Sequence, residues 1–268
     1  MKYVCLLLIG VLLFSCIHGA EINRIVSLAP SLTKNLQYLG AEDRLVGCTS
    51  YCKTTREVEI VATAVKVNIE KVVSIKPELV IATTITNHET IETLRKFGIR
   101  IEVYPTARSF NDICSQFLNL GKIIGKEKHA IAVVNDSRKK VEQLQQSLTS
   151  EQKPKMFIQI GANPLYTVYP NTFMDDYITF AGAQNIASDL TIGSITRECV
   201  LLRNPDIIFV VTMGIVGEEE KAIWEKVEEL NASKNKKIFI IESDKACTPT
   251  PVTFVETLET IINLTYRK

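Results

Sequence analysis

The sequence has almost no excess charge and no cluster of basic residues. Its 31 Lys and Arg residues stand against 30 Asp and Glu residues, and Lys2 is the one base among the first fifteen positions. Nucleic-acid binding depends on clustered Lys and Arg side chains that neutralise phosphates, so this composition argues against a nucleic-acid partner. It also leaves no polybasic patch that could bind a membrane surface.

Familiar catalytic sequence motifs are missing as well. The chain contains no G-x-S-x-G, no G-x-x-x-x-G-K-[ST] and no H-E-x-x-H pattern. Its three His residues, at positions 18, 88 and 129, are scattered, which argues against a His-based metal centre. We therefore expect no catalytic residues, no protein-bound metal and no catalytic cofactor. A cysteine- or metal-dependent enzyme that uses Cys52 or Cys247 is a remote alternative, because no base lies near either residue in the sequence.

The first twenty residues are expected to be a signal peptide. Lys2 precedes an apolar stretch, Val4–Phe14, that is too short to span a bilayer and is placed like the hydrophobic region of a secretory leader. It ends in Leu-Phe-Ser-Cys, which is similar to the site where a lipid is attached to the Cys of bacterial lipoproteins. We predict export, with lipidation at Cys16 as the membrane anchor. Ordinary cleavage near Gly19 is the alternative.

Seven Cys residues occur in the chain, and two of them fall in the leader. An odd number remains in a compartment that is expected to be oxidising, so at most two disulfides can form and one thiol stays free. The remaining residues are Cys48, Cys52, Cys114, Cys199 and Cys247.

Strand and helix patterns alternate along the chain, which predicts an α/β fold with parallel sheets. Between positions 126 and 150 this alternation stops. Apolar residues recur there at helical spacing without Gly or Pro, which predicts one long amphipathic helix of about 37 Å. We therefore expect a signal peptide over 1–20, an α/β lobe over 21–125, a connecting helix over 126–150 and a second α/β lobe over 151–268. Residues 49–67 are expected to form a loop beside the cleft between the lobes.

Two segments repeat one pattern without a gap. Residues 68–82 and 196–210 each begin with a helix-capping residue and carry a Glu two positions later. Each then continues through a Pro and an acid into an apolar run typical of a buried strand. A single repeat of so long a period indicates two similar lobes rather than a solenoid. Two shorter matches agree with a duplication: residues 38–43 with 180–185, and 25–30 with 158–164.

These segments resemble the periplasmic substrate-binding proteins of ABC importers, in the class whose two Rossmann-like lobes are joined by one long helix. That class carries vitamin B12, haem and ferric siderophores, and the closest similarity is to the vitamin B12-binding branch. The resemblance covers essentially the whole chain after the leader. It is carried by residues 24–51, 68–83, 157–166 and 196–211.

The resemblance gives the two repeated Glu residues a role. In this class, a carboxylate near the start of one helix in each lobe docks onto Arg residues of the permease dimer. Glu70 and Glu198 occupy these positions, and two equivalent acids suit a two-fold symmetric partner. The alternative is structural, because an acid in a first helical turn stabilises the helix by ~0.3–1 kcal/mol.

The resemblance also implies that loops at the carboxyl ends of the parallel strands contact the ligand. Tyr51 and Tyr166 match aromatic pocket positions of the vitamin B12 branch. The positions where that branch has corrin-facing Trp residues fall near residues 64–65, Thr83 and Ile192, and none is aromatic here. Each lost ring forfeits about 0.5–1.5 kcal/mol. The expected ligand contacts are Pro30, Ser31, Ser50, Tyr51, Cys52, Thr83, Tyr166, Ile192 and Cys247.

The Cys residues and the single Trp indicate a function less specifically than the residues above. Cys48 and Cys52 could form a disulfide, stay inert or, with Cys247, ligate cobalt, haem iron or a soft metal. Cys114 and Cys199 are expected in the core, and Trp224 in helix packing.

The sequence thus predicts a monomeric, exported solute-binding protein, in the periplasm or anchored to the envelope. Its ligand would be a metal chelate, cobalamin or another corrinoid first, and haem or a ferric siderophore as the alternative. The partners would be an ABC permease dimer and its ATPase subunits.

Overall fold

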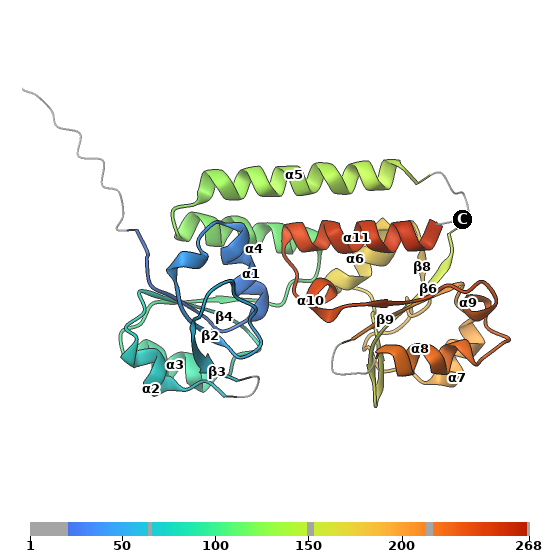
Figure 1. Cartoon of the computed structure of the whole chain (residues 1–268), viewed down its shortest axis with the longest axis horizontal. Helices are drawn as coiled ribbons and strands as arrows, with labels where there is room; N and C mark the ends of the chain where they lie inside the picture. The colour runs from blue at the N-terminus through green and yellow to red at the C-terminus, as the bar shows by residue number, and fades with distance from the viewer. Residues whose placement is uncertain (1–20, 64–65, 149–152, 213–216, 267–268) are drawn as a thin grey trace, which may run out of the picture.

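The computed structural model describes residues 21–63, 66–148, 153–212 and 217–266 (Figure 1). The predicted leader and its Cys16 lie outside the described residues, as do positions 64–65. Within these ranges, no helix combines the length and the apolar character that crossing a membrane requires.

The N-lobe is built on a parallel five-stranded sheet in the order β3-β2-β1-β4-β5. Helices α1 to α4 each follow a strand of this sheet, and β3 follows β2 with no helix between them. The strands are β1 (Ile25–Ser27), β2 (Leu45–Thr49), β3 (Glu59–Ala62), β4 (Leu79–Thr83) and β5 (Ile101–Tyr104). The helices are α1 (Pro30–Tyr38), the 3-10 turn η1 (Glu42–Arg44), α2 (Ile69–Ser74), α3 (His88–Lys96) and α4 (Phe110–Ile123).

The C-lobe contains the second sheet, in which β10, β9, β6 and β8 run parallel and β7 pairs antiparallel with β6. Its strands are β6 (Lys155–Ala162), β7 (Leu165–Thr167), β8 (Gln184–Asn185), β9 (Ile207–Val211) and β10 (Ile238–Ile241). Its helices are α6 (Phe173–Phe180), α7 (Arg197–Arg203), α8 (Gly217–Glu225), α9 (Asn231–Lys234), α10 (Ser243–Ala246) and α11 (Pro251–Tyr266). The two lobes lie side by side in Figure 1.

The longer repeat of the sequence corresponds to one structural unit in each lobe. Asn68 caps α2 by accepting the Lys71 backbone N–H, and Thr196 caps α7 by accepting the Cys199 N–H. The strands that follow, β4 and β9, are five-residue runs at the same distance from their caps. The repeat near Gly40 and Gly182 is also structural, because both residues follow a helix with positive φ.

The third matched pair is displaced by two residues. Ile25 pairs with Leu79 in β4, and the residue that pairs with the equivalent position in β9 is Met156. Met156 rather than Ile158 is therefore the counterpart of Ile25. Residues 25–30 and 158–164 both end in a Pro, but this similarity does not mark equivalent positions. Strand β6 has eight residues and continues into a hairpin, whereas β1 has three.

Two predicted boundaries were wrong. The expected loop over residues 49–67 contains β3, an edge strand that pairs with β2 alone and whose outer half is exposed, so it lacks the apolar pattern of a buried strand. The helix expected over 126–150 is α5 (Glu127–Gln146). Ser147 is the C-cap of α5, and Leu148 beyond it packs against the core. Positions 149–150 of the predicted helix lie outside the described residues.

Helix α5 runs along one side of both lobes (Figure 1). It packs on α4 of the N-lobe and on α11 of the C-lobe. Beneath it the lobes also touch directly: Phe110 of α4 stacks on Phe254 of α11, with ring centroids 4.5 Å apart, and Tyr177 of α6 stacks on the same ring at 4.5 Å. The Asp176 carboxylate accepts the Phe110 N–H at 2.7 Å and so caps α4 from the other lobe. One apolar core thus extends through both lobes.

The C-lobe also contains a buried polar network. Trp224, 1% exposed, donates its indole N–H to Gln159 at 2.6 Å, and Gln159 donates to Glu220 at 2.7 Å. Arg197 forms an ion pair with Glu220 at 2.7 Å and lies over the Trp224 ring. The predicted packing role of Trp224 is confirmed, and its indole nitrogen has the partner that a buried Trp requires.

Candidate functional site

Two adjoining cavities lie between the lobes. The larger, about 790 Å³, is bordered by the loop after β5 and the start of α4 on one side and by β6, β7 and the start of α6 on the other. The smaller, about 130 Å³, is bordered by the start of α1, the end of β4 and the segment after α10. Both cavities share the residues Pro105, Thr106, Ala107, Gln116 and Phe173. Their location at the carboxyl ends of parallel strands is the usual place for a ligand in α/β proteins.

Three of the expected ligand contacts border the smaller cavity. They are Ser31 at the start of α1, Thr83 at the end of β4, and Cys247 after α10. The structure therefore brings together side chains from three separate parts of the sequence. Pro30 directly precedes Ser31 as the first residue of α1.

Four other expected contacts are exposed and, among the described residues, border neither cavity. Ser50 and Tyr51 follow β2, and Tyr51 is 65% exposed. Tyr166 in β7 and the nearby Ile192 are 37% and 63% exposed. These side chains could reach a ligand in two ways. The ligand would have to extend beyond the cavities, or the lobes would have to close further around it.

The Tyr166 ring has a defined seat in the C-lobe. A Cβ atom added to Gly193 would lie 2.3 Å from Cε1 of Tyr166 and 2.6 Å from the Thr167 carbonyl oxygen. Gly193 therefore allows the ring to pack against the neighbouring backbone, which no other residue at that position would permit. The closeness of these segments is also seen in the bridge between Tyr166 and Ser194.

None of the residues that the two cavities share is among the predicted ligand contacts. The segment 105–107 directly follows β5, and the same carboxyl-end rule that selected the other loops could have selected it. Phe173 and Gln116 carried no such signal, because they lie in helices α6 and α4 and reach the cavities only through the packing of the lobes. The apolar Ile85, 82% exposed, also borders the smaller cavity.

The three thiols near the cleft differ in environment. Burial raises the pKa of the Cys247 thiol to about 11, so Cys247 presents a neutral thiol to the smaller cavity. Cys48 is buried, whereas Cys52 is partly exposed and, of the described residues, borders neither cavity. The structure holds all three as free thiols. No group of three or more His, Cys, Asp or Glu side chains in the described ranges could hold a metal ion. Cys114 lies in the core as expected, but Cys199 is only half-buried.

An ionic cluster joins the lobes beside the cleft. Lys34 of α1 lies 3.0 Å from the Asp244 carboxylate of α10 and donates to the Thr248 hydroxyl at 3.1 Å. Lys53, next to Cys52, approaches the same carboxylate at 3.3 Å. Burial alone would raise the pKa of Asp244, but the two Lys side chains outweigh it and hold that pKa below its usual range. This carboxylate is therefore charged at neutral pH and ties the lobes together.

Helices α2 and α7, which carry Glu70 and Glu198, lie on the side of the molecule opposite α5, one at the tip of each lobe (Figure 1). Both Glu side chains are exposed in the first turn of their helices. Hydrogen bonds from its own backbone N–H and from the Thr196 hydroxyl hold the pKa of Glu198 below its usual range. Both carboxylates are thus exposed, and the helices that carry them lie on one side of the molecule (Figure 1).

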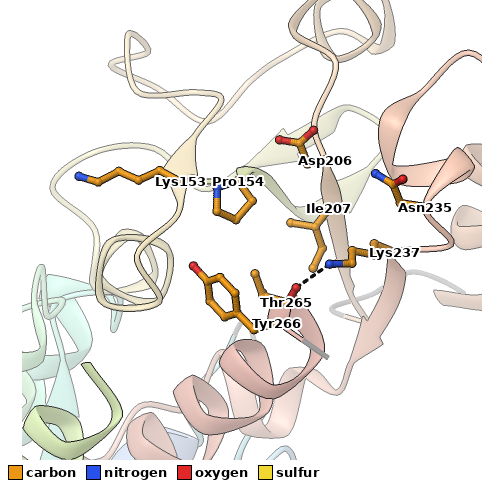
Figure 2. A pocket seen from close by; sticks show the side chains of 8 residues that line it. All are labelled: Lys153, Pro154, Asp206, Ile207, Asn235, Lys237, Thr265 and Tyr266. Carbon is orange, nitrogen blue, oxygen red and sulfur yellow. Dashed lines mark hydrogen bonds between the residues drawn. The ribbon is translucent and has the colours of Figure 1, made fainter. Parts of the chain in front are cut away.

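A third cavity, of about 570 Å³, lies at the amino ends of β6 and β9 (Figure 2). Figure 2 shows Lys237 reaching the Thr265 carbonyl oxygen, a hydrogen bond of 2.7 Å. The Asp206 carboxylate accepts the Lys155 N–H and the Asn231 side chain. These groups connect elements within the C-lobe, far from the carboxyl ends, and we do not regard this cavity as the ligand site.

Comparison with known proteins gives a consistent picture. A family model described as periplasmic binding protein matches residues 25–245. An uncharacterized ABC transporter substrate-binding lipoprotein of Bacillus subtilis is 31% identical over 84% of this chain and 74% of its own length. A vitamin B12-binding protein of Vibrio vulnificus is 28% identical over 91% of each chain. A solved structure of a possible iron-binding, periplasmic solute-binding protein of Staphylococcus epidermidis superimposes with a TM-score of 0.80 at 25% identity, over 92% of this chain and 100% of that one. The chain belongs to the periplasmic binding protein family.

Proposed function

We propose that the protein captures a bulky metal chelate, a corrinoid such as cobalamin first, and delivers it to an ABC permease without chemical change. The observation that carries this proposal is the pair of adjoining cavities between the carboxyl edges of two parallel sheets. The larger cavity falls within the range of about 300–1,000 Å³ that is usual for small-molecule sites. The Vibrio vulnificus relative, which matches nearly the whole chain, is named for vitamin B12.

Exposed apolar side chains on both lobes support a large ligand. Tyr51 and Ile85 of the N-lobe and Tyr166 and Ile192 of the C-lobe are all exposed. A flat macrocycle that extends beyond the cavities would cover such residues and remove their apolar surface from water. The family and the predicted leader agree on an extracytoplasmic location.

Haem or another iron chelate is the second candidate. It is favoured by the absence of aromatic residues at Thr83 and Ile192, where the vitamin B12 branch places rings toward the corrin. The similarity to a possible iron-binding protein agrees with this alternative.

Retained colour distinguishes these ligands. Purified protein would be mixed separately with cobalamin, hemin and a ferric siderophore, desalted, and examined by visible spectroscopy, with calorimetry to measure affinity. We expect retained cobalamin absorbance. The Phe173→Ala change, which removes a ring from both cavities, should weaken binding at least tenfold. Phe97→Ala removes an exposed ring outside both cavities and is the matched control. Loss of all three chromophores on desalting would contradict the proposal.

We further propose that Glu70 and Glu198 dock onto basic residues of the permease. Opposite charges of this kind set orientation and association rate more than ligand affinity. Glu70→Ala with Glu198→Ala should therefore abolish ligand-stimulated ATP hydrolysis by the reconstituted transporter and leave ligand affinity unchanged. Glu89→Ala with Glu218→Ala is a matched control, since these exposed acids also lie in first helical turns. Equal stimulation by all variants would refute the docking role.

A further inference from the structure

The turn that follows β2 brings two thiols together at the edge of the cleft. Cys48 is the fourth residue of β2 and is 1% exposed, whereas Cys52 is partly exposed. The Cys52 N–H bonds to the Thr49 carbonyl at 3.0 Å and closes the turn. The two thiols interact with each other, and the interaction lowers the pKa of Cys52 and raises that of Cys48. The proposed transport function does not use this pair, because Cys52 is not among the described residues that border the cavities.

Two hydroxyl groups also face the Cys52 sulfur. The Thr33 hydroxyl of α1 lies 3.1 Å from Cys52 Sγ and 2.9 Å from Ser27 Oγ, so its one proton is shared between these two acceptors. The Thr49 Oγ1 lies 3.3 Å from the same sulfur. Hydrogen bonds from Cys48, Thr33 and Thr49 outweigh the effect of burial and lower the pKa of Cys52 to about 6. The hydrogen bond to Cys52, together with burial, raises the pKa of Cys48. Cys52 is thus the partly exposed and more readily ionised thiol of the pair, and Cys48 is the buried one.

We propose that Cys48 and Cys52 form a reversible disulfide by exchange with a protein or small-molecule disulfide outside the cytoplasm. The Cys52 thiolate attacks one sulfur of the external disulfide, so that a mixed disulfide forms and one external thiolate leaves. Cys48 then loses its proton to solvent, and its sulfur attacks Cys52 Sγ and releases the second external thiolate. Two electrons pass from the protein thiols to the external disulfide, which is fully reduced.

The arrangement of the two residues sets the order of these steps. Cys52 reacts first because it is partly exposed and has the lower pKa of the two, and the thiolate is the attacking species. Once Cys52 is in the mixed disulfide, it no longer carries the charge that Cys48 stabilises by hydrogen bonding. The main cause of the raised Cys48 pKa is then removed, so Cys48 can ionise and complete the exchange.

The first test measures the reactivity of Cys52 as a function of pH. Reduced protein would be labelled briefly with iodoacetamide between pH 5 and pH 9, and each Cys followed by peptide mass spectrometry. Cys247 is the matched control, because it is also partly exposed but has its pKa raised by burial. Thiolate fraction and nucleophilicity together predict that Cys52 reacts on the order of 50-fold faster at pH 7. Its rate should level off above about pH 7, whereas the rate at Cys247 should keep rising. An inflection for Cys52 near the ordinary value of about 8.5 would overturn the proposal.

The second test follows the disulfide itself in the purified protein. With oxidised glutathione, the wild type should form a Cys48–Cys52 link that reduced glutathione reverses. Cys48→Ser should instead accumulate a stable glutathione adduct at Cys52, because the second step is blocked. Thr33→Val, which keeps the size of the side chain but removes the donor, should shift the Cys52 inflection to higher pH while circular dichroism stays unchanged. The proposal is wrong if the wild type and Cys48→Ser give the same adduct, or if the link joins other Cys residues.

Discussion

In the N-lobe, the residue after β1 is Leu28, whereas the structurally equivalent residue of the C-lobe is Gln159, which is fully buried. The N-lobe strand is enclosed by aliphatic side chains, including Val61, Val72 and Val80. The C-lobe strand faces the network of Glu220, Arg197 and Trp224. Two copies of one backbone arrangement are therefore stabilised by different chemistry. Strand register survives such a divergence because the same positions stay buried in both lobes, whatever the chemistry of the side chains there.

The largest effect is expected where the two lobes meet. Phe254 is fully buried and stacks between Phe110 of the N-lobe and Tyr177 of the C-lobe. Phe254→Ala should lower the free energy of unfolding by about 3–5 kcal/mol. Because the single Trp lies in the C-lobe, urea unfolding followed by Trp224 fluorescence and by circular dichroism should coincide in the wild type and separate in the variant. Phe97→Ala, at an exposed ring, should cost less than about 0.5 kcal/mol. Coincident curves in the variant would show that the lobes stay coupled without this ring.

The second prediction isolates the C-lobe network. Glu220→Ala leaves Arg197 and Gln159 without their buried acceptor, and the free energy of unfolding at pH 7 should fall by about 2 kcal/mol. Urea denaturation monitored by Trp224 fluorescence measures this loss. Glu225→Ala is the matched control, since its pair with Lys221 is exposed and 3.8 Å long, and it should change stability by less than about 0.5 kcal/mol. If the two variants were equally stable, the network would not distinguish the lobes.

The third prediction tests the equivalence of the repeated units. Asn68→Ala and Thr196→Ala each remove one side-chain acceptor at a helix start, and each should lower the free energy of unfolding by about 1 kcal/mol. Replacement of either residue by Ser keeps the acceptor and should cost much less. Thermal unfolding provides the measurement. A loss confined to one of the two Ala variants would mean that the units are alike in shape but not in energetic role.

The smallest effect concerns Asp244 at the contact between the lobes. The pKa of this acid is lowered in the folded protein, so its contribution to stability is present above its unfolded value of about 3.9 and is lost as the pH falls through the lower folded value. Asp244→Asn should therefore destabilise the protein by about 0.5 kcal/mol at pH 7. Urea denaturation at pH 7 and pH 3 should show that the difference between variant and wild type shrinks in acid. A difference that did not change with pH would exclude the ion pair as its cause.

The sequence allowed much of the fold to be predicted because the repeated unit carries its own local signals. Asn68 and Thr196 are residues that favour the start of a helix, and each unit ends in an apolar run that is typical of a buried strand. The edge strand β3 and the end of α5 were missed, since half-exposed strands and terminal turns leave weak patterns. The register error at Ile158 arose because similar residues occur two positions apart in a longer strand.

The candidate site was less predictable. Of the predicted contacts, Ser31, Thr83 and Cys247 border the smaller cavity, and all three lie on the carboxyl-end side of the strands that precede them. Phe173 and Gln116 reach the cavities from helices, and their position depends on how the two lobes pack, which no single segment encodes. The contact between Thr33 and the Cys52 sulfur was likewise not predicted, because Thr33 lies 19 residues away in the sequence.

The position of α5 has a practical consequence for studying the protein. Its outward face carries exposed side chains such as Lys139 and Glu142, and it lies on the side of the molecule away from α2 and α7 (Figure 1). A biotin attached there would tether the protein to a biosensor chip with helices α2 and α7 on the side that faces the flowing solution. Transporter particles in nanodiscs could then be passed over it, and their arrival and departure timed without steric obstruction.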